Sequence, residues 1–213
     1  MKNLKPEDFA PLSGVVTVVL LAVTVILFNA YDYFPTPART AEIFRLAADR
    51  AFFIALFGML AGLALVWFSG SLFSSLKQHE SGSGRLAITA MAGGVVSGAG
   101  LIGAYGVVYF AAGQAGRPGG IDLSEAWVMY SLYSALMGLL HGLVLMIGAA
   151  GLVALRTRAF PSRFGWVSVV VALGLVTPLD YIFEGIALVW IVAVSVWFFV
   201  REAREIPSST TGV

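Results

Sequence analysis

Residues 86–116 read LAITAMAGGVVSGAGLIGAYGVVYFAAGQAG, a stretch of 31 residues without one charged side chain. Arg85 precedes it and Arg117 follows it. The apolar core of a bilayer is about 30 Å thick, and an α-helix needs roughly 20 apolar residues to cross it. The stretch exceeds that length, so it predicts a transmembrane helix.

The composition of all 213 residues agrees with a membrane protein. Charged residues make up 12% of the chain and hydrophobic residues 59%, whereas a soluble globular domain is about 25% charged. A water-soluble fold of this size needs a polar exterior that this composition cannot supply. A conventional soluble enzyme, a disordered chain and a nucleic-acid-binding protein are therefore excluded. The absence of Cys excludes thiol catalysis, Cys-ligated metals and disulfides.

Five further uncharged stretches bring the number of predicted transmembrane helices to six. We expect residues 1–213 to form one all-α, polytopic transmembrane bundle, with helices over 10–31, 51–75, 86–112, 126–155, 164–178 and 181–200. The last two stretches hold 16 residues each and must borrow flanking residues to span. They are expected to form a tight hairpin through residues 177–180. The alternative is a re-entrant hairpin, but Arg163 and Arg201 at its two ends favour full crossings.

The distribution of Lys and Arg predicts an orientation, because cationic residues near span ends are retained in the cytoplasm. If the N-terminus is inside, nine Lys or Arg lie on inner segments and four on outer ones. We therefore expect both the N-terminus and the C-terminus to be cytoplasmic. The protein should be a multi-pass protein of the cytoplasmic membrane, with the lipid bilayer as its surroundings and no nucleic-acid partner.

Two predicted outer loops carry helix-start signals. Thr36 and Pro37 predict an amphipathic outer helix over residues 38–50, which either caps the bundle at the outer leaflet or acts as a lid or docking surface. Asp122 resembles an N-cap with Glu125 at N3, which places acidic groups at the start of the fourth span. The candidates for outer ion pairs are Arg50, Arg117, Asp122 and Glu125.

Glycines at four-residue spacing predict close helix packing in three successive spans. The pairs are Gly58 and Gly62, Gly94 and Gly98, and Gly138 and Gly142. In lipid, this spacing lets helix backbones approach closely. We expect a compact bundle around the second, third and fourth spans. One of these faces is alternatively the surface of a homo-oligomer or of a contact with a membrane protein partner.

Three ionisable residues form a candidate polar, ion or proton site. His141 lies near the middle of the fourth span, where an ionisable group is costly and often functional. The alternative is a neutral imidazole that hydrogen-bonds to a neighbouring helix. Asp180 and Glu184 lie four residues apart on one face, which we expect at the outer start of the sixth helix. They either cap that helix or form ion pairs, or they bind a cation or relay a proton.

Catalytic and cofactor motifs are absent from the sequence. It contains no Gly-x-Ser-x-Gly elbow, His-Glu-x-x-His pair, P-loop or dinucleotide fingerprint. No Lys lies in a span, which excludes a retinal Schiff base, and His79 is expected in a cytoplasmic loop, which excludes bis-His haem ligation with His141. We expect no cofactor, no metal and no catalytic residue.

Short motifs precede the second, third and fifth predicted spans. They are the Pro35–Pro37 turn before residues 41–43, residues 84–86, and Pro161 with residues 163–166. With these motifs the whole chain resembles the small six-helix membrane proteins of unknown function that are common in bacteria. The resemblance implies only the fold and the membrane location, and it identifies no site residue.

Three functions remain open at this point. The first is a non-catalytic accessory or interaction subunit of the cytoplasmic membrane, which the short loops and Gly-rich faces favour. The second is a small-solute or proton-coupled transporter that uses His141, Asp180 and Glu184. The third is a membrane enzyme with an outward-facing carboxylate site.

Overall fold

The computed structural model describes residues 10–28, 35–80, 82–157 and 161–204, and these residues form helices without any strand. The elements are α1 (Ser13–Phe28), α2 (Pro37–Ala47), η2 (Ala48–Arg50), α3 (Ala51–His79), α4 (Arg85–Ala115), α5 (Leu123–Met137), η3 (Gly138–His141), α6 (Gly142–Thr157), α7 (Ser162–Gly174) and α8 (Asp180–Arg204). The prediction of an all-helical chain with several long apolar helices is confirmed. Residues 29–31 of the first predicted span, both termini and Arg158 lie outside the described residues.

Five helical segments of the described chain are long and apolar enough to cross a membrane. They are Ala10–Phe28, Pro37–His79, Arg85–Ala115, Leu123–Thr157 and Asp180–Arg201. Leu123–Thr157 is one continuous run of 35 residues, because the short 3₁₀ turn η3 joins α5 directly to α6. Helix α7 is apolar but has only 13 residues.

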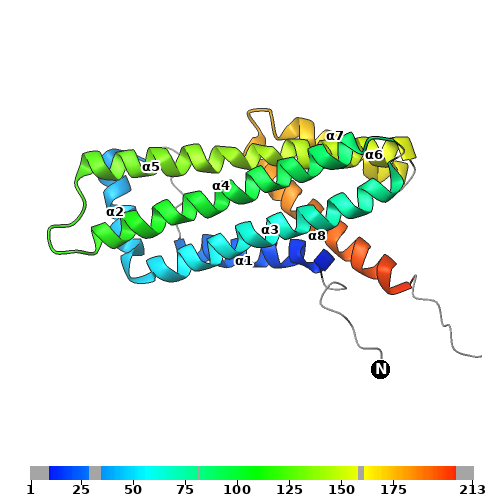
Figure 1. Ribbon diagram of the computed structural model, residues 1–213. Helices are drawn as coiled ribbons and strands as arrows, with labels where there is room; N and C mark the ends of the chain where they lie inside the picture. Colours follow the sequence, from blue (N-terminus) through cyan, green and yellow to red (C-terminus); the bar gives the residue numbers. More distant parts are fainter. Residues whose placement is uncertain (1–9, 29–34, 81, 158–160, 205–213) are drawn as a thin grey trace, which may run out of the picture.

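The centre of the bundle is the contact between α3 and α4, which run side by side along its long axis (Figure 1). Helix α1 packs on α3, and α6 packs on α4. The glycines set these contacts: Gly62 and Gly98 face each other, and Gly93 faces Gly142, at distances that leave no room for a Cβ atom. Five of the six predicted glycines are therefore enclosed by other helices of the same chain, whereas nothing lies within 4 Å of a Cβ placed on Gly138.

Helix α2 lies across one end of the bundle (Figure 1). The Thr36 hydroxyl accepts a hydrogen bond from the Arg39 amide at 3.3 Å, and Pro37 occupies the first turn. The buried face of α2 contacts α4 and α5 through Phe44, which packs with Ala111, Ala115 and Ala126. The segment thus caps the bundle, as one of the two sequence interpretations proposed.

Helix α7 is shorter than the full crossing that the sequence predicts over residues 164–178. Thirteen residues of α7 are about 20 Å long, less than the roughly 30 Å of a bilayer core. Asp180, which follows the turn, lies beside His141, with 3.9 Å between Oδ2 and Nε2. Because His141 is near the midpoint of Leu123–Thr157, the hairpin turns at mid-length of the bundle (Figure 1).

Helix α8 then runs back toward the end from which α7 entered. The Ser195 hydroxyl donates to the Pro11 carbonyl oxygen at 2.6 Å, next to the start of α1. The indole of Trp190 in α8 donates to the Ser168 hydroxyl in α7 at 2.8 Å, and its ring stacks on Phe164. The expected position of Asp180 at the outer end of the bundle is therefore not what the structure shows.

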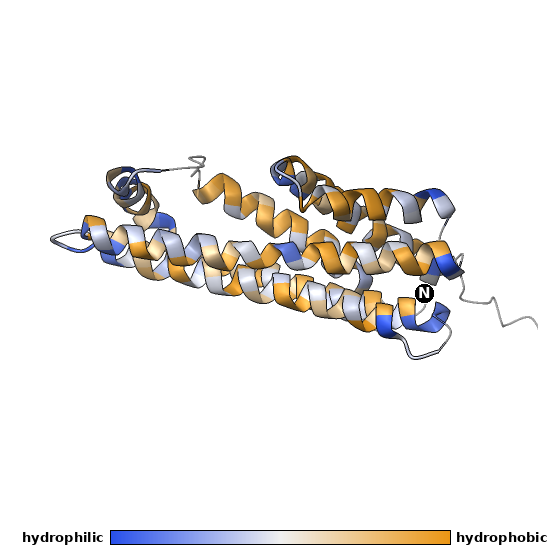
Figure 2. Ribbon diagram, turned by 90° about the horizontal axis from the view of Figure 1, so that it is seen from above, coloured by the Kyte–Doolittle hydropathy of each residue, from blue (hydrophilic) through white to orange (hydrophobic). Residues whose placement is uncertain are grey.

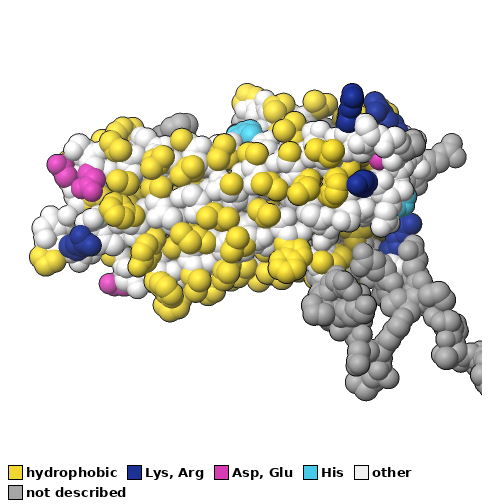
Figure 3. Space-filling view, viewed as in Figure 1, with side chains coloured by type: hydrophobic (Ala, Val, Ile, Leu, Met, Phe, Trp, Pro, Cys, Tyr) yellow, Lys and Arg dark blue, Asp and Glu magenta, His cyan; other side chains and the backbone are white. Residues whose placement is uncertain are grey.

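Hydrophilic residues gather at the two ends of the bundle, and hydrophobic residues predominate along the length between them (Figure 2). On the face drawn in Figure 3, the Lys, Arg, Asp and Glu side chains lie at the two ends. Among the described side chains, one end carries five basic residues and one acid: Lys77, Arg85, Arg156, Arg163, Arg201 and Glu80. The opposite end carries four of each: Arg39, Arg45, Arg50, Arg117, Glu42, Asp49, Asp122 and Glu125. This distribution fits a membrane protein whose long axis crosses the bilayer.

Candidate functional site

The candidate site is the contact between η3 and the start of α8. His141 ends η3, and its Nδ1 lies 2.9 Å from the Gly138 carbonyl oxygen. A carbonyl oxygen can only accept, so Nδ1 carries the hydrogen of that bond. In the neutral ring, Nε2 is then an acceptor that faces Asp180 Oδ2 at 3.9 Å. Protonation of Nε2 converts this contact into an ion pair.

Asp180 is held in place by the first turn of α8. Its Oδ1 accepts a hydrogen bond from the Tyr181 amide at 2.8 Å, while its Oδ2 remains directed at His141. The preceding turn is fixed by Thr177, whose hydroxyl donates to the Gly174 carbonyl oxygen at 2.7 Å and accepts from the Leu179 amide at 3.3 Å. Both carboxylate oxygens of Asp180 therefore have defined directions.

Glu184 lies one helical turn after Asp180 and completes the group. Its carboxylate is half-buried and interacts electrostatically with both Asp180 and His141. The adjacent Phe183 ring fills the space beside Gly174 in α7, where a Cβ atom would clash with it. This contact sets the rotation of α8 on α7 and so helps to aim Glu184. The structure brings together all three residues proposed for the polar site.

A group of aromatic rings adjoins these charges, and the sequence analysis did not single it out. Tyr133 is at its centre, with ring centroids 6.0 Å from Phe28, 6.4 Å from Tyr105 and 6.1 Å from Tyr130. Tyr133 lies within range of the Glu184 charge. One signal was available: Tyr130, Tyr133, Met137 and His141 recur at three- or four-residue spacing, which places them on one helical face.

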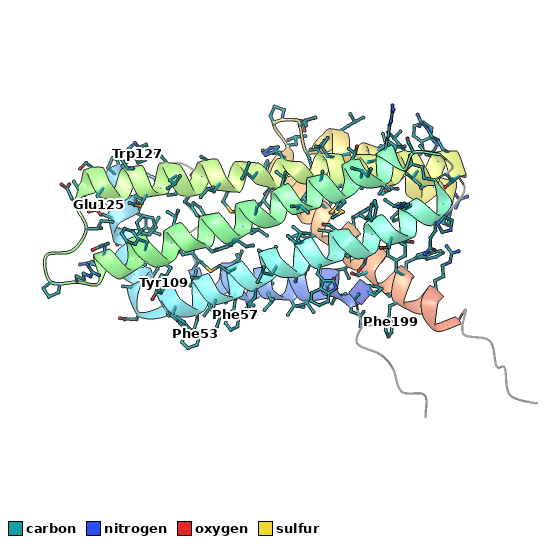
Figure 4. The ribbon with its side chains drawn as sticks, viewed as in Figure 1. Phe53, Phe57, Tyr109, Glu125, Trp127 and Phe199 are labelled. Atoms are coloured by element: carbon teal, nitrogen blue, oxygen red, sulfur yellow. The ribbon has the colours of Figure 1, made fainter. Side chains whose placement is uncertain are left out.

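Among the described residues, the four candidates for outer ion pairs form no ion pair with one another. Arg117 donates to the Gln114 side chain at 3.0 Å, and Asp122 accepts from the Ser124 amide at 3.1 Å as the N-cap of α5. Arg50 and Glu125 are exposed at the same end of the bundle. Figure 4 shows Glu125 and Trp127 on the first turns of α5, far from the α7–α8 turn. Sixteen residues of helix separate Glu125 from His141, which is about 24 Å.

Within the described part of the chain, no group of three or more His, Asp or Glu residues is placed to hold a metal ion. The three residues can instead exchange protons or face a cationic group. Comparison with protein-family models, with curated proteins and with solved structures gave no match.

Proposed function

We propose that this protein is a proton-coupled carrier of a small solute in the cytoplasmic membrane. The observation that carries the proposal is the meeting of His141, Asp180 and Glu184 at mid-length of a bundle whose other described charges lie at its two ends. The group changes its charge whenever one of its members gains or loses a proton. A change of charge at mid-length of the bundle couples proton movement to solute movement.

The cost of this arrangement supports a functional role. An Asp at the centre of a transmembrane helix costs about 2.5–3.5 kcal/mol on insertion scales. The side chains of His141 and Asp180 are 48% and 43% exposed in the isolated chain, so the group is not closed off inside the helix packing. A chain that needed only stability would carry apolar residues here.

The charge distribution at the two ends supports the orientation that we infer. With the more basic end inside, the positive-inside rule places both termini in the cytoplasm. In this frame α1, α3, α4 and the α5–α6 helix cross the bilayer. We infer that α7 and α8 form a re-entrant hairpin. Although α8 is long enough to cross a membrane, it begins beside His141 at mid-length and runs back to the end where α1 begins.

The proposal is tested in proteoliposomes that hold a pH-sensitive dye. Four probes are added outside in turn: the cation tetramethylammonium, the neutral sugar glucose, and the anions glutamate and inorganic phosphate. We expect at least one probe to change the internal pH several-fold faster than in protein-free vesicles. Glu184→Gln should abolish this response because its side chain cannot exchange a proton.

Glu125→Gln is the matched control, since Glu125 is exposed at the far end of the bundle. It should transport like the unmodified chain. A response that is missing for all four probes, or that survives in Glu184→Gln, would contradict the proposal.

A second candidate function is an accessory subunit that binds another membrane protein. It is favoured by the same exposure of His141 and Asp180, because a partner helix laid over them would remove them from lipid. In that case the chain purified alone would transport none of the probes, and it would co-purify in mild detergent with a partner that Asp180→Asn releases. The third function, an enzyme with an outward-facing carboxylate site, has no such support, because Asp180 and Glu184 lie far from Asp122 and Glu125.

A further inference from the structure

The outward face of α3 changes in polarity along its length. It begins with apolar side chains, continues with two hydroxyl groups and ends with a cation. Its members lie three or four residues apart, and none of them is buried: Leu60, Leu63, Trp67, Ser71, Ser74 and Lys77. The polarity of this face therefore changes along the helix axis, as it does from the interior of a bilayer to its surface.

Two hollows lie along this face and meet at Trp67. The first has a volume of about 620 Å³ and lies between α1 and α3, where Val16 and Leu63 are among its apolar lining residues. The second has a volume of about 470 Å³ and lies between α3 and Met91 of α4, beside Gly70. Trp67 lines both hollows and is 66% exposed. Both volumes fall within the range of about 300–1,000 Å³ that is typical of ligand sites.

Two positive charges lie at the polar end of the second hollow. The Lys77 Nζ atom is 5.5 Å from the centroid of the Phe73 ring, which lines the hollow. A Cβ placed on Gly84 would lie 3.8 Å from Lys77 Cγ, so Lys77 is beside the start of α4, whose first residue is Arg85. Neither cation forms an ion pair with another described residue, and the Glu80 carboxylate is bound to two amides of α4. Both cations are therefore available to an anion.

The length of the face fits one lipid molecule. Fourteen residues of helix separate Leu63 from Lys77, which is about 21 Å. One leaflet of a bilayer with its headgroups is about 20–22 Å thick. A headgroup at Lys77 thus places the ester groups of a lipid near Ser71 and Ser74 and its acyl chains along Trp67. The Ser71 hydroxyl donates only a long hydrogen bond within the described chain, 3.4 Å to the Trp67 carbonyl oxygen, so it is able to turn toward an ester group.

An anionic phospholipid fits this combination better than a helix of a second protein does. A straight helix laid along α3 would rest on the protruding Trp67 ring and leave the hollows unfilled, whereas two flexible acyl chains can enter one hollow each. The cations select the headgroup, because a Lys or Arg near the membrane surface attracts anionic lipid by about 1 kcal/mol.

We propose that the outward face of α3 between Leu63 and Lys77 binds one anionic glycerophospholipid. Its phosphate lies at Lys77 and Arg85, and its two acyl chains lie in the hollows that meet at Trp67. None of the three residues of the candidate functional site takes part, so the inference does not rest on the proposed function.

The test is native mass spectrometry of the full chain in mild detergent with equal amounts of dioleoylphosphatidylglycerol and dioleoylphosphatidylcholine. The two lipids have the same acyl chains and differ in net charge. We expect one molecule of phosphatidylglycerol to stay bound at least fivefold more often than phosphatidylcholine, and Lys77→Gln to lower this preference about fivefold. Glycerol phosphate, which lacks the chains, should not displace the lipid. Equal retention of the two lipids by the unmodified chain would overturn the inference.

Gly70→Leu tests the second hollow without disturbing the fold. A Cβ placed on Gly70 meets nothing within 4 Å, and Gly70 lines the hollow, so the Leu side chain should take the place of an acyl chain. We expect several-fold less bound phosphatidylglycerol and no loss of stability in lipid-free detergent, because Leu favours a helix more than Gly does.

Gly113→Leu is the matched control, because its Cβ also meets nothing within 4 Å and it lies near the other end of α4. It should retain phosphatidylglycerol like the unmodified chain. Equal retention by Gly70→Leu and Gly113→Leu would contradict the assignment of the hollow. A dimer that Gly70→Leu separates would also contradict it, since a second copy of the chain would then cover this face.

Discussion

Gly142 lies where α6 approaches α4 most tightly at the level of the candidate site. A Cβ atom at this position would come within 2.7 Å of the Ser97 hydroxyl and still closer to the Gly93 carbonyl oxygen. The Ser97 hydroxyl is also 3.3 Å from the Leu139 carbonyl oxygen and 3.2 Å from that of Leu140. The same contact thus positions η3 and, with it, His141.

We predict that Gly142→Ala destabilises the protein by about 1–3 kcal/mol, because the added methyl group overpacks a backbone contact. The measurement is unfolding in detergent, followed by circular dichroism. Gly138→Ala is the control, since its Cβ meets nothing within 4 Å and its helical backbone accepts Ala. Equal loss of stability in the two variants would contradict a tight backbone contact at Gly142.

Sequence spacing alone could not show that these two glycines have different surroundings. Gly138 and Gly142 are spaced like the pairs in α3 and α4, yet Gly142 is enclosed and Gly138 is open. Gly100 in α4 packs against Leu136 and Leu139, which lie on either side of Gly138 in the sequence, so Gly138 is on the exposed face of the α5–α6 helix that α4 does not cover.

The α7–α8 hairpin is the element whose geometry matters most for function. Its α7 helix is too short to cross a bilayer core, and its turn places Asp180 beside His141. The hydrogen bond between Trp190 and Ser168 joins the two helices at a buried position. The N-terminus of α8 therefore points into the bundle at mid-length, where its positive dipole end faces the carboxylate of Asp180.

We predict that a single cysteine introduced as Val176→Cys resists a membrane-impermeant maleimide added outside intact cells. Val176 lies at the α7–α8 turn, is exposed in the isolated chain, and would be surrounded by lipid, where a thiol stays protonated and unreactive. The chain contains no native Cys, so the label reports one site. Leu123→Cys, at the exposed start of α5, should be labelled readily. Equal labelling of the two positions would favour two full crossings instead of a re-entrant hairpin.

The whole molecule is organised by the separation of its charged ends. Of the side chains that the structure describes, five basic residues and one acid lie at the end that holds the α3–α4 loop, against four of each at the end that α2 caps. Glu80 also has a structural role at the first end, because its carboxylate accepts hydrogen bonds from the Leu86 and Ala87 amides at 3.1 and 2.9 Å. The excess of positive charge at this end supports its cytoplasmic location.

The orientation predicts the labelling of the α3–α4 loop. A cysteine introduced as Ser83→Cys, at an exposed loop position, should react with the impermeant maleimide only after the cells are permeabilised. Leu123→Cys should react without permeabilisation, because it lies at the opposite end. The reverse pattern would invert the orientation and place both termini outside.

The amino-acid sequence by itself determined that this chain needs lipid around it, and it determined the approximate bounds of its helices. Uncharged stretches such as 86–116 cannot be placed in water, and the capping residues Thr36 and Asp122 act through neighbours in the sequence, so both features are local. Only the tertiary structure decided three other features: the position of the α7–α8 turn along the bundle, the contact of His141 with Asp180, and the ring cluster at Tyr133. They depend on contacts between residues far apart in the chain, such as Ser195 with Pro11 and Phe183 with Gly174. Hydropathy predicts the length of a helix, whereas the position of that helix along the bundle depends on how it packs against the other helices.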